Sequence, residues 1–292
     1  MAVGQYGVGP VVSGGGGGLA NPATLASGSI LQGNPANTIA ELAIGSESQI
    51  LVAQSSGLLA YEDYINASKR VVFYDDFITG GNGTSFGSPH WQQSGGSGGA
   101  VGATYNTAYG FGVTNPGCFY LYSGTSVNAH AQLYGDNSCG VNFIGGGAAT
   151  WETLVRNLDV STAGNTYIIK MGWMNRATPS AAVVSGIYFS YTTGTNWILN
   201  CTNASTTTTS DTGIAAAAAT WYKLRFDVNA AGTSVQAYVN GVAAGAPIVT
   251  NIPVNTVGMT QVYQMYSTAW ASGFRLMLVD YVKFVQTLTV AR

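Results

Sequence analysis

The sequence is poor in charge, and this shortage argues against several classes of function. Only 8% of its 292 residues are charged, against about 25% in an average soluble protein. The formal net charge is -2, so the chain offers no basic surface for nucleic acid or for an anionic membrane. A surface with so little charge favours association. We therefore expect an assembled protein and no nucleic-acid partner.

Cysteine and histidine are also scarce. The cysteines are Cys118, Cys139 and Cys201, and the histidines are His90 and His130. An odd number of cysteines without a Cys-x-x-Cys pair forms neither a disulfide framework nor a zinc site. Free thiols suit a protein that folds in a reducing cytosol. The sequence thus predicts free cysteines and no cofactor held by these side chains.

Long apolar runs are missing as well. No segment approaches the ~18 unbroken apolar residues of a transmembrane helix. The first ten residues, MAVGQYGVGP, lack the basic region and apolar core of a secretory signal. We expect neither insertion into a membrane nor a cleaved signal peptide.

The residues that are abundant favour strands and turns. The chain has 40 glycines and 17 tyrosines, and it is rich in Ser and Thr. Residues 221–228 alternate between apolar and polar, as in a half-buried strand. Asn240-Gly241 marks a two-residue hairpin, and 274–285 is apolar on both faces, which suits a central strand. The sequence predicts an all-β sandwich over residues 71–292.

The sequence before this body has two parts. Residues 1–37 contain the run SGGGGGL and read as a glycine-rich arm that anchors the chain to its surroundings. Residues 38–70 read as a small β-hairpin unit with turn signals at 45–47 and 55–57. We therefore expect three parts: an arm, a hairpin unit and the body at 71–292.

The hairpin unit needs a partner surface. A lone hairpin is marginally stable in water, and identical chains around a symmetry axis supply the missing surface most simply. The side chains expected to associate are Ile39, Leu42, Ile44, Ile50, Leu51 and Leu58.

This segment resembles a known class of proteins. The run LAIGSESQIL at 42–51, the extended piece ending at Tyr61 and the preceding Gly-Ser-Ile-Leu-x-Gly at 28–33 are similar to segments of tailed-phage fibre, collar and other appendage proteins. The resemblance implies a virion structural protein that is a homotrimer, assembles in the host cytoplasm and binds other virion proteins through residues 1–37. A tail fibre or tail-associated appendage is the first interpretation. A capsid decoration or head-fibre protein stays open.

The body carries a second resemblance. VFYDDF at 72–77, the unit at 221–241 and LVDYVK at 278–283 look like the concanavalin-type lectin and glucanase jelly roll, especially the laminarinase-type glucanases. The resemblance implies a lectin-like jelly-roll domain. A receptor-binding or glycan-binding head is compatible with this fold.

The catalytic motif of those glucanases is missing. They carry Glu-x-Asp-x-(x)-Glu on one strand, which presents two carboxylates for glycoside hydrolysis. The only glutamate in the body is Glu152, and Asp159 does not fit that spacing. We expect no enzyme and no catalytic residues, with a polysaccharide-binding or polysaccharide-degrading protein as the remaining alternative.

Two kinds of binding residue follow. In the glucanases a structural calcium lies where the first and last strands meet, and the resemblance places it at Asp76 and Asp280. The alternative is that these carboxylates bond the backbone or face solvent.

Sugar sites use exposed aromatic rings beside amides and hydroxyls, which favours Trp197 and Trp270 for a host-surface glycan. Packing or a subunit interface remains the alternative for each ring. The tryptophans expected in the core are Trp91, Trp151, Trp173 and Trp221.

Overall fold

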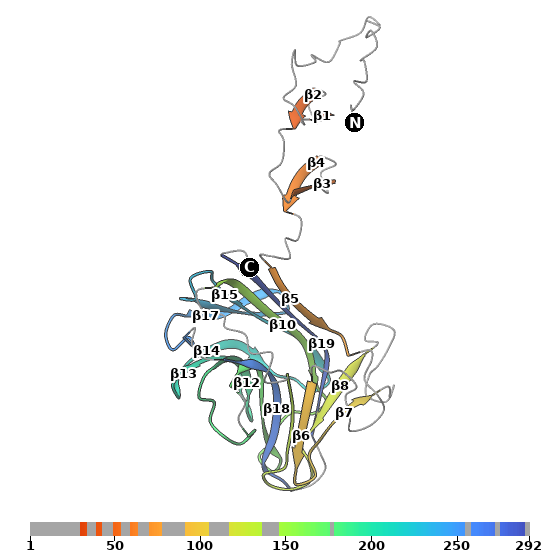
Figure 1. Cartoon of the computed structure of the whole chain (residues 1–292). Coiled ribbons are helices and arrows are strands. Elements are labelled where there is room, and N and C mark those ends of the chain that lie inside the picture. The colour runs from red at the N-terminus through yellow and green to blue at the C-terminus, as the bar shows by residue number, and fades with distance from the viewer. Residues whose placement is uncertain are drawn as a thin grey trace, which may run out of the picture. The chain divides into compact units, whose positions relative to one another are not determined.

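The computed structural model shows two compact units, 1–67 and 68–292 (Figure 1). It describes residues 30–33, 39–42, 49–53, 59–63, 70–77, 91–104, 117–135, 146–175, 178–254, 258–271 and 275–289, with the backbone alone for 30–63 and 102–104. All regular elements in these ranges are β-strands. Within them, no helix is long and apolar enough to cross a membrane.

The first unit contains two antiparallel strand pairs. β1 (Ile30–Gly33) pairs with β2 (Ile39–Leu42), and β3 (Gln49–Ala53) pairs with β4 (Leu59–Asp63). The expected turn at 55–57 therefore separates two paired strands. The described strands on either side of the turn signal at 45–47 do not pair with each other, because β2 pairs with β1, the strand that precedes it. The turn signal Asn34-Pro35 separates β1 from β2.

The first pair begins inside the segment that the sequence presents as an arm. The oligomerisation prediction is not tested by these strands. The side chains of Ile39, Leu42, Ile50 and Leu51 are not described, and Ile44 and Leu58 lie outside the described residues.

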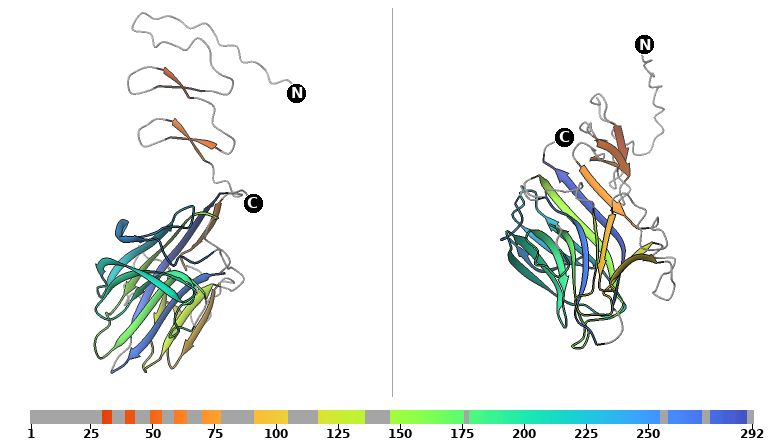
Figure 2. Two further views of the ribbon diagram at one scale, coloured as in Figure 1. Left: turned by 90° about the vertical axis from the view of Figure 1, so that its left-hand side faces the viewer. Right: turned by 60° about the horizontal axis from the view of Figure 1, so that its bottom comes forward.

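The body consists of two antiparallel sheets (Figures 1 and 2). The first sheet has the order β17-β16-β15-β10-β19-β8-β7, and β5 also pairs with β19. Its strands are β5 (Arg70–Asp75), β7 (Ala100–Thr104), β8 (Cys118–Tyr122), β10 (Gly147–Asn157), β15 (Thr220–Val228), β16 (Val235–Val239), β17 (Val242–Ile248) and β19 (Leu276–Leu288).

The second sheet has the order β14-β13-β12-β11-β18-β9-β6. Its strands are β6 (Trp91–Gly96), β9 (His130–Gly135), β11 (Thr166–Met174), β12 (Gly186–Tyr191), β13 (Asn196–Asn203), β14 (Thr206–Ala215) and β18 (Thr260–Ala269). The all-β sandwich predicted from the sequence is confirmed.

Alternating side chains build the core between the sheets. In β15 the expected pattern holds, with Tyr222, Leu224 and Phe226 buried. Trp151 of β10 is fully buried and stacks on Phe226 with ring centroids 5.2 Å apart. Burying side chains of this size contributes about 1.5–3 kcal/mol each. Trp91 and Trp173 also lie in this core, whereas Trp221 is only partly buried.

The last strand is central, as its two apolar faces predict. β19 pairs with β10 on one side and with β5 and β8 on the other. The pairing register between β19 and β10 shifts by one residue. Leu154 is opposite Tyr281, whereas the next residue, Val155, is opposite Val279. Asp280 is therefore an extra residue in β19, and such bulges re-aim side chains.

Candidate functional site

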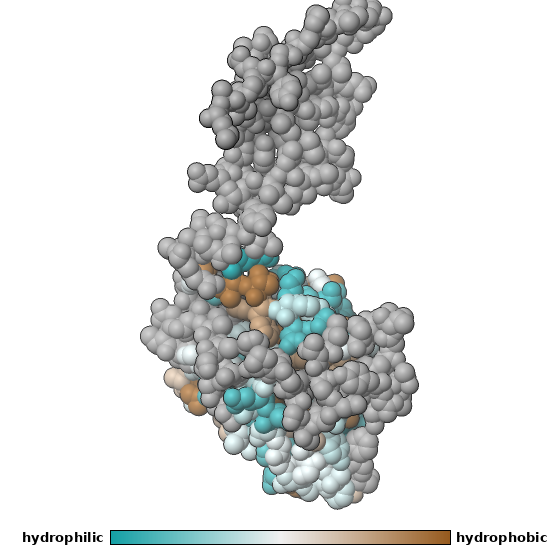
Figure 3. Space-filling view, turned by 45° about the vertical axis from the view of Figure 1, so that its right-hand side comes forward, coloured by the Kyte–Doolittle hydropathy of each residue, from teal (hydrophilic) through white to brown (hydrophobic). Residues whose placement is uncertain are grey.

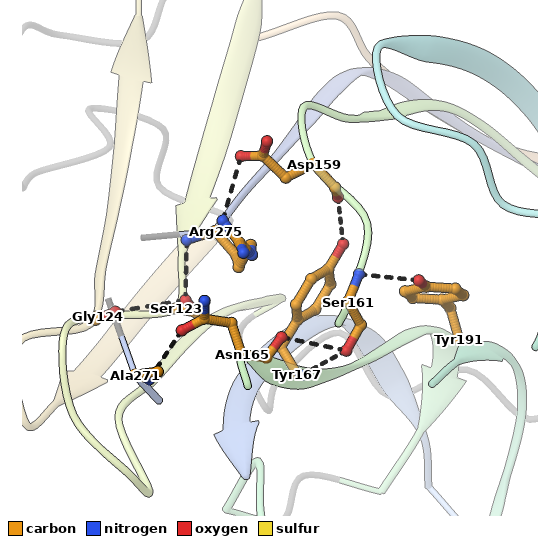
Figure 4. A network of polar contacts seen from close by, with 9 residues as sticks. All are labelled: Ser123, Gly124, Asp159, Ser161, Asn165, Tyr167, Tyr191, Ala271 and Arg275. Atoms are coloured by element: carbon orange, nitrogen blue, oxygen red, sulfur yellow. Dashed lines mark hydrogen bonds and ion pairs between the residues drawn. The ribbon is translucent and has the colours of Figure 1, made fainter. Parts of the chain in front are cut away.

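One end of the sandwich brings together three connections that are far apart in sequence (Figure 4). We call this the loop-end surface and define it by Asp159, Asn165, Thr268, Trp270 and Arg275. Main-chain and side-chain hydrogen bonds join the connections. The main-chain nitrogen of Ser123 donates to the Arg275 carbonyl at 2.9 Å, and the Arg275 nitrogen donates to Ser123 Oγ at 3.2 Å.

Ser161 fixes the connection between β10 and β11. Its main-chain nitrogen donates to the Tyr191 hydroxyl at 3.0 Å, and its Oγ accepts from the Tyr167 nitrogen at 3.0 Å (Figure 4). Its Oγ also lies 2.6 Å from Thr193 Oγ1. The Tyr167 hydroxyl donates to the Asp159 carbonyl. Burial raises the pKa of Tyr167 and of Tyr191, so both hydroxyls keep their protons above the pH at which an ordinary tyrosine ionises.

The network leaves one carboxylate facing solvent. Asp159 Oδ2 is 3.8 Å from Arg275 Nη1, and the two side chains are 52% and 18% exposed, respectively. An ion pair of this exposure contributes about 0–1 kcal/mol. The Asp159 carboxylate therefore stays available to accept hydrogen bonds from a ligand.

Trp270 follows β18 and has 40% of its surface exposed. The residue after it is held in place, since Asn165 Oδ1 accepts a hydrogen bond from the Ala271 nitrogen at 2.9 Å. Thr268 Oγ1 donates to the Thr166 carbonyl at 3.3 Å. The surface thus combines an exposed indole, the amide of Asn165 and the hydroxyl of Thr268 around it, and the carboxylate of Asp159 beside Arg275. Such a set can stack on the apolar face of a sugar ring and bond its hydroxyls.

The prediction that Trp197 binds a glycan is wrong. It is fully buried, with ring centroids 5.7 Å from Tyr191 and 5.8 Å from Tyr222. The alternation of β13 turns Trp197 and Leu199 into the core, while Asn196 faces outward. The polar neighbours in the sequence belong to the opposite face of the strand, so Trp197 cannot stack on a ligand.

Asp280 lies at the bulge of β19 and is 8% exposed. Its Oδ1 accepts a hydrogen bond from Cys118 Sγ at 3.6 Å. Burial, and then the charge of Asp280, raise the pKa of the Cys118 thiol. A thiol held in this protonated state is a poor metal ligand.

Asp76 belongs to the same neighbourhood. Burial raises the pKa of Tyr74, and the charges of Asp76 and Asp280 raise it further. The adjacent Asp75 has other partners, because it accepts from the Phe77 nitrogen at 2.8 Å and from Trp91 Nε1 at 2.7 Å. Among the described residues, no group of three or more His, Cys, Asp or Glu side chains could hold a metal. Calcium at Asp76 and Asp280 stays a prediction.

The outer face of the second sheet is covered by the chain itself. Lys170 Nζ donates to the carbonyls of Pro179 and Ala181, at 3.3 and 2.7 Å, in the connection between β11 and β12. The same ammonium lies 5.4 Å from the Tyr266 ring centroid, and burial lowers its pKa. The same face carries a second apolar cluster, of Tyr134, Met174, Val183, Tyr188 and Val262.

Sequence reasoning missed this role of Lys170. The available signal was a lysine inside the otherwise apolar run YIIKMGWM.

Carboxylates are scarce on the second sheet, whereas the strands of the first sheet carry Asp75, Glu152, Asp227 and Asp280. Among the described strands of the second sheet, only β14 carries one, Asp211, which is exposed. Glu152 lies on β10 of the first sheet and accepts a hydrogen bond from the Tyr281 hydroxyl at 2.7 Å. These two side chains belong to different sheets.

The two packed sheets define a jelly roll of the concanavalin and glucanase type. Residues 114–280 match the family model described as the SO2946-like, C-terminal domain, and the chain belongs to this family. No curated protein matches the sequence.

Two solved structures share the fold at low sequence identity. The protein of unknown function SO2946 from Shewanella oneidensis MR-1 is 12% identical, with a TM-score of 0.51 over 77% of this chain and 90% of that chain. The endo-1,3-beta-glucanase from Streptomyces sioyaensis is 13% identical, with a TM-score of 0.51 over 76% of this chain and 98% of that chain.

Proposed function

We propose that the body is a carbohydrate-binding domain without hydrolytic activity. The observation that carries this proposal is Trp270, which stands 40% exposed beside a residue that Asn165 fixes. A ring on a fixed loop binds at a smaller entropic cost than a ring on a loose one. The hydroxyl of Thr268, two positions before Trp270, and the Asp159 carboxylate of the same loop-end surface would orient a sugar ring.

The similarity to a glucanase supports the ligand class. A fold used by an endo-1,3-beta-glucanase can present a surface to a polysaccharide. Glycoside hydrolysis needs a pair of carboxylates that flank the scissile bond. The described strands of the second sheet carry only Asp211. On the first sheet, Glu152 is bonded to Tyr281. Asp227 pairs with Arg225, and Asp280 accepts from Cys118. Binding without turnover fits these residues better than hydrolysis.

We further propose that the chain is a phage virion structural protein, a trimeric tail fibre or tail-associated appendage. The sequence at 28–61 resembles such proteins, and its strand pairs are four and five residues long. Pairs this short are marginal alone, so three copies that share a surface would stabilise them. Residues 1–37 would bind other virion proteins, and the body would bind a glycan of the host surface.

A glycan array tests the binding, with the full chain as wild type, Trp270→Ala and Trp221→Ala. Trp221 is the matched control because it is a partly buried tryptophan of the first sheet. We expect the wild type and Trp221→Ala to bind the same glycans and Trp270→Ala to lose about tenfold in affinity, or 1.4 kcal/mol. No bound glycan, or unchanged binding by Trp270→Ala, would overturn the proposed site.

Light scattering tests the assembly separately. The chain mass is 30.1 kDa, and we expect three times this mass for the particle in solution. A monomer mass would contradict the trimer and leave the carbohydrate site standing.

A further inference from the structure

The outer face of the first sheet carries a straight row of five polar or aromatic side chains. The strand registers place Tyr74 opposite Lys283, Lys283 opposite Glu152, Glu152 opposite Arg225, and Arg225 opposite Tyr238. We call these five residues the cross-strand row. It crosses β5, β19, β10, β15 and β16, so its length is four strand spacings, or about 19 Å.

Both ends of the row are aromatic, and both rings are held. Tyr74 is 57% exposed, and its ring stacks on Tyr281 with centroids 6.0 Å apart and planes 29° apart. At the other end, the Arg225 guanidinium lies 4.3 Å from the centroid of the Tyr238 ring. The row therefore offers a stacking surface at each end.

The charges of the row are balanced when the neighbouring Asp227 is included. Arg225 forms an ion pair with Asp227, and Arg225 Nε donates to Asp227 Oδ1 at 2.9 Å. Lys283 is opposite Glu152 in the sheet. Lys283 and Arg225 of the row are thus matched by Glu152 of the row and by Asp227 beside it, so this part of the face suits a polar ligand without net charge.

A groove adjoins the row. It encloses about 330 Å³, which is near the lower end of the ~300–1,000 Å³ found for small-ligand sites. Thr150, Asp227 and Gln236 line it from β10, β15 and β16, the strands that also carry part of the row. Its remaining lining residues are Ala148, Ala149, Val228, Asn229 and Ser234. Polar groups beside a small apolar floor match one sugar ring.

A protein partner fits this face less well. Protein interfaces are apolar at their centre and polar at the rim. Here the exposed apolar side chains, Val72 and Tyr74, lie together on β5, and the charged groups occupy the middle. The space-filling view likewise shows a small apolar patch bordered by hydrophilic residues at the upper end of the described body (Figure 3).

We propose that the outer face of the first sheet binds an extended neutral oligosaccharide, which lies along the cross-strand row and places one ring in the adjoining groove. This site is separate from the loop-end surface, and it rests on the proposed function only for the class of ligand.

The test is methyl NMR of the valine-labelled full chain, titrated with soluble 1,3-β-glucan oligosaccharides and with any neutral glycan bound on the array. Val72 and Val285 are opposite each other beside the row and report on it. Val127, in the connection between β8 and β9, reports on the loops. Tyr74→Ala and Tyr238→Ala remove the aromatic ends. Tyr120→Ala, on β8 and away from the row, is the matched control.

We expect ligand-induced shifts at Val72 and Val285, and we expect these shifts to persist in Trp270→Ala and in Tyr120→Ala. In Tyr74→Ala or Tyr238→Ala the same shifts should need about tenfold more ligand, a loss of 1.4 kcal/mol in binding free energy. Shifts confined to Val127 would overturn this inference and leave the loop-end site standing. If Trp270→Ala abolishes all binding, the inference also fails. Shifts at Val72 that follow protein concentration without glycan would identify a contact between copies of the chain and overturn it as well.

Discussion

Asn165 holds Ala271 across 106 positions of sequence, through a 2.9 Å hydrogen bond from the Ala271 main-chain nitrogen to the Asn165 side-chain oxygen. Because Ala271 follows Trp270 directly, this bond sets how the indole stands on the loop-end surface. The position of the exposed ring thus depends on a connection that belongs to other strands.

The first prediction concerns this bond. Asn165→Ala removes the acceptor and should weaken glycan binding severalfold, while stability falls by about 1 kcal/mol, the net value of one hydrogen bond. Asn165→Asp keeps an acceptor oxygen and should retain most of the binding. Unfolding followed by tryptophan fluorescence measures the change in stability, and array binding measures the change in glycan affinity. If Asn165→Ala binds like the wild type, Asn165 does not position Trp270.

A second prediction separates the two tryptophans singled out by sequence. Trp197 lies in the core, so Trp197→Ala should lower the free energy of unfolding by about 3–5 kcal/mol. Trp270→Ala removes a partly exposed ring and should cost far less. Urea unfolding of both variants gives the comparison, and equal costs would contradict the burial of Trp197.

The third prediction concerns pH. Burial raises the pKa of the Cys201 thiol from 9.0 to about 12. The folded state then keeps a proton that the unfolded state loses, so the stabilisation is complete below pH 9 and is lost as the pH rises towards 12. The limiting slope is about 1.4 kcal/mol per pH unit for one group.

Cys201→Ala lacks this group, so its free energy of unfolding should fall less steeply with pH over this range. Buried tyrosines act in the same direction in both proteins and cancel in the comparison. Parallel curves for the wild type and the variant would contradict the assignment to Cys201.

A fourth prediction tests calcium at Asp76 and Asp280. If the ion is present, EDTA should lower the melting temperature and added calcium should restore it. Asp280→Asn should remove this response, while Asp211→Asn, at an exposed carboxylate of β14, should keep it. If neither EDTA nor added calcium changes the melting temperature of the wild type, there is no structural calcium at Asp76 and Asp280.

Local patterns in the sequence predict the strands well and their partners less well. The alternation at 221–228 is visible in the letters, because a half-buried strand needs it. The two apolar faces of β19 likewise predict a central position. The sequence did not predict that β2 pairs with β1, because short apolar runs lie at similar distances on both sides of β2 and either run could form a hairpin with it.

The site was only partly visible for the same reason. Trp270 and Trp197 have similar polar neighbours in sequence, but the direction of each side chain depends on the register of its strand. Contacts such as Asn165 with Ala271 join distant segments and leave no local signal. The cross-strand row needs the registers of five strands, so no single window of the sequence contains it.

The most direct test of the central claim is a quantitative comparison of the wild type and Trp270→Ala on a glycan array, with reducing-end release assayed on every glycan that binds. We predict that the wild type binds at least one glycan without cleaving it and that Trp270→Ala binds this glycan about tenfold more weakly. Cleavage of a bound glycan, or undiminished binding by Trp270→Ala, would contradict it.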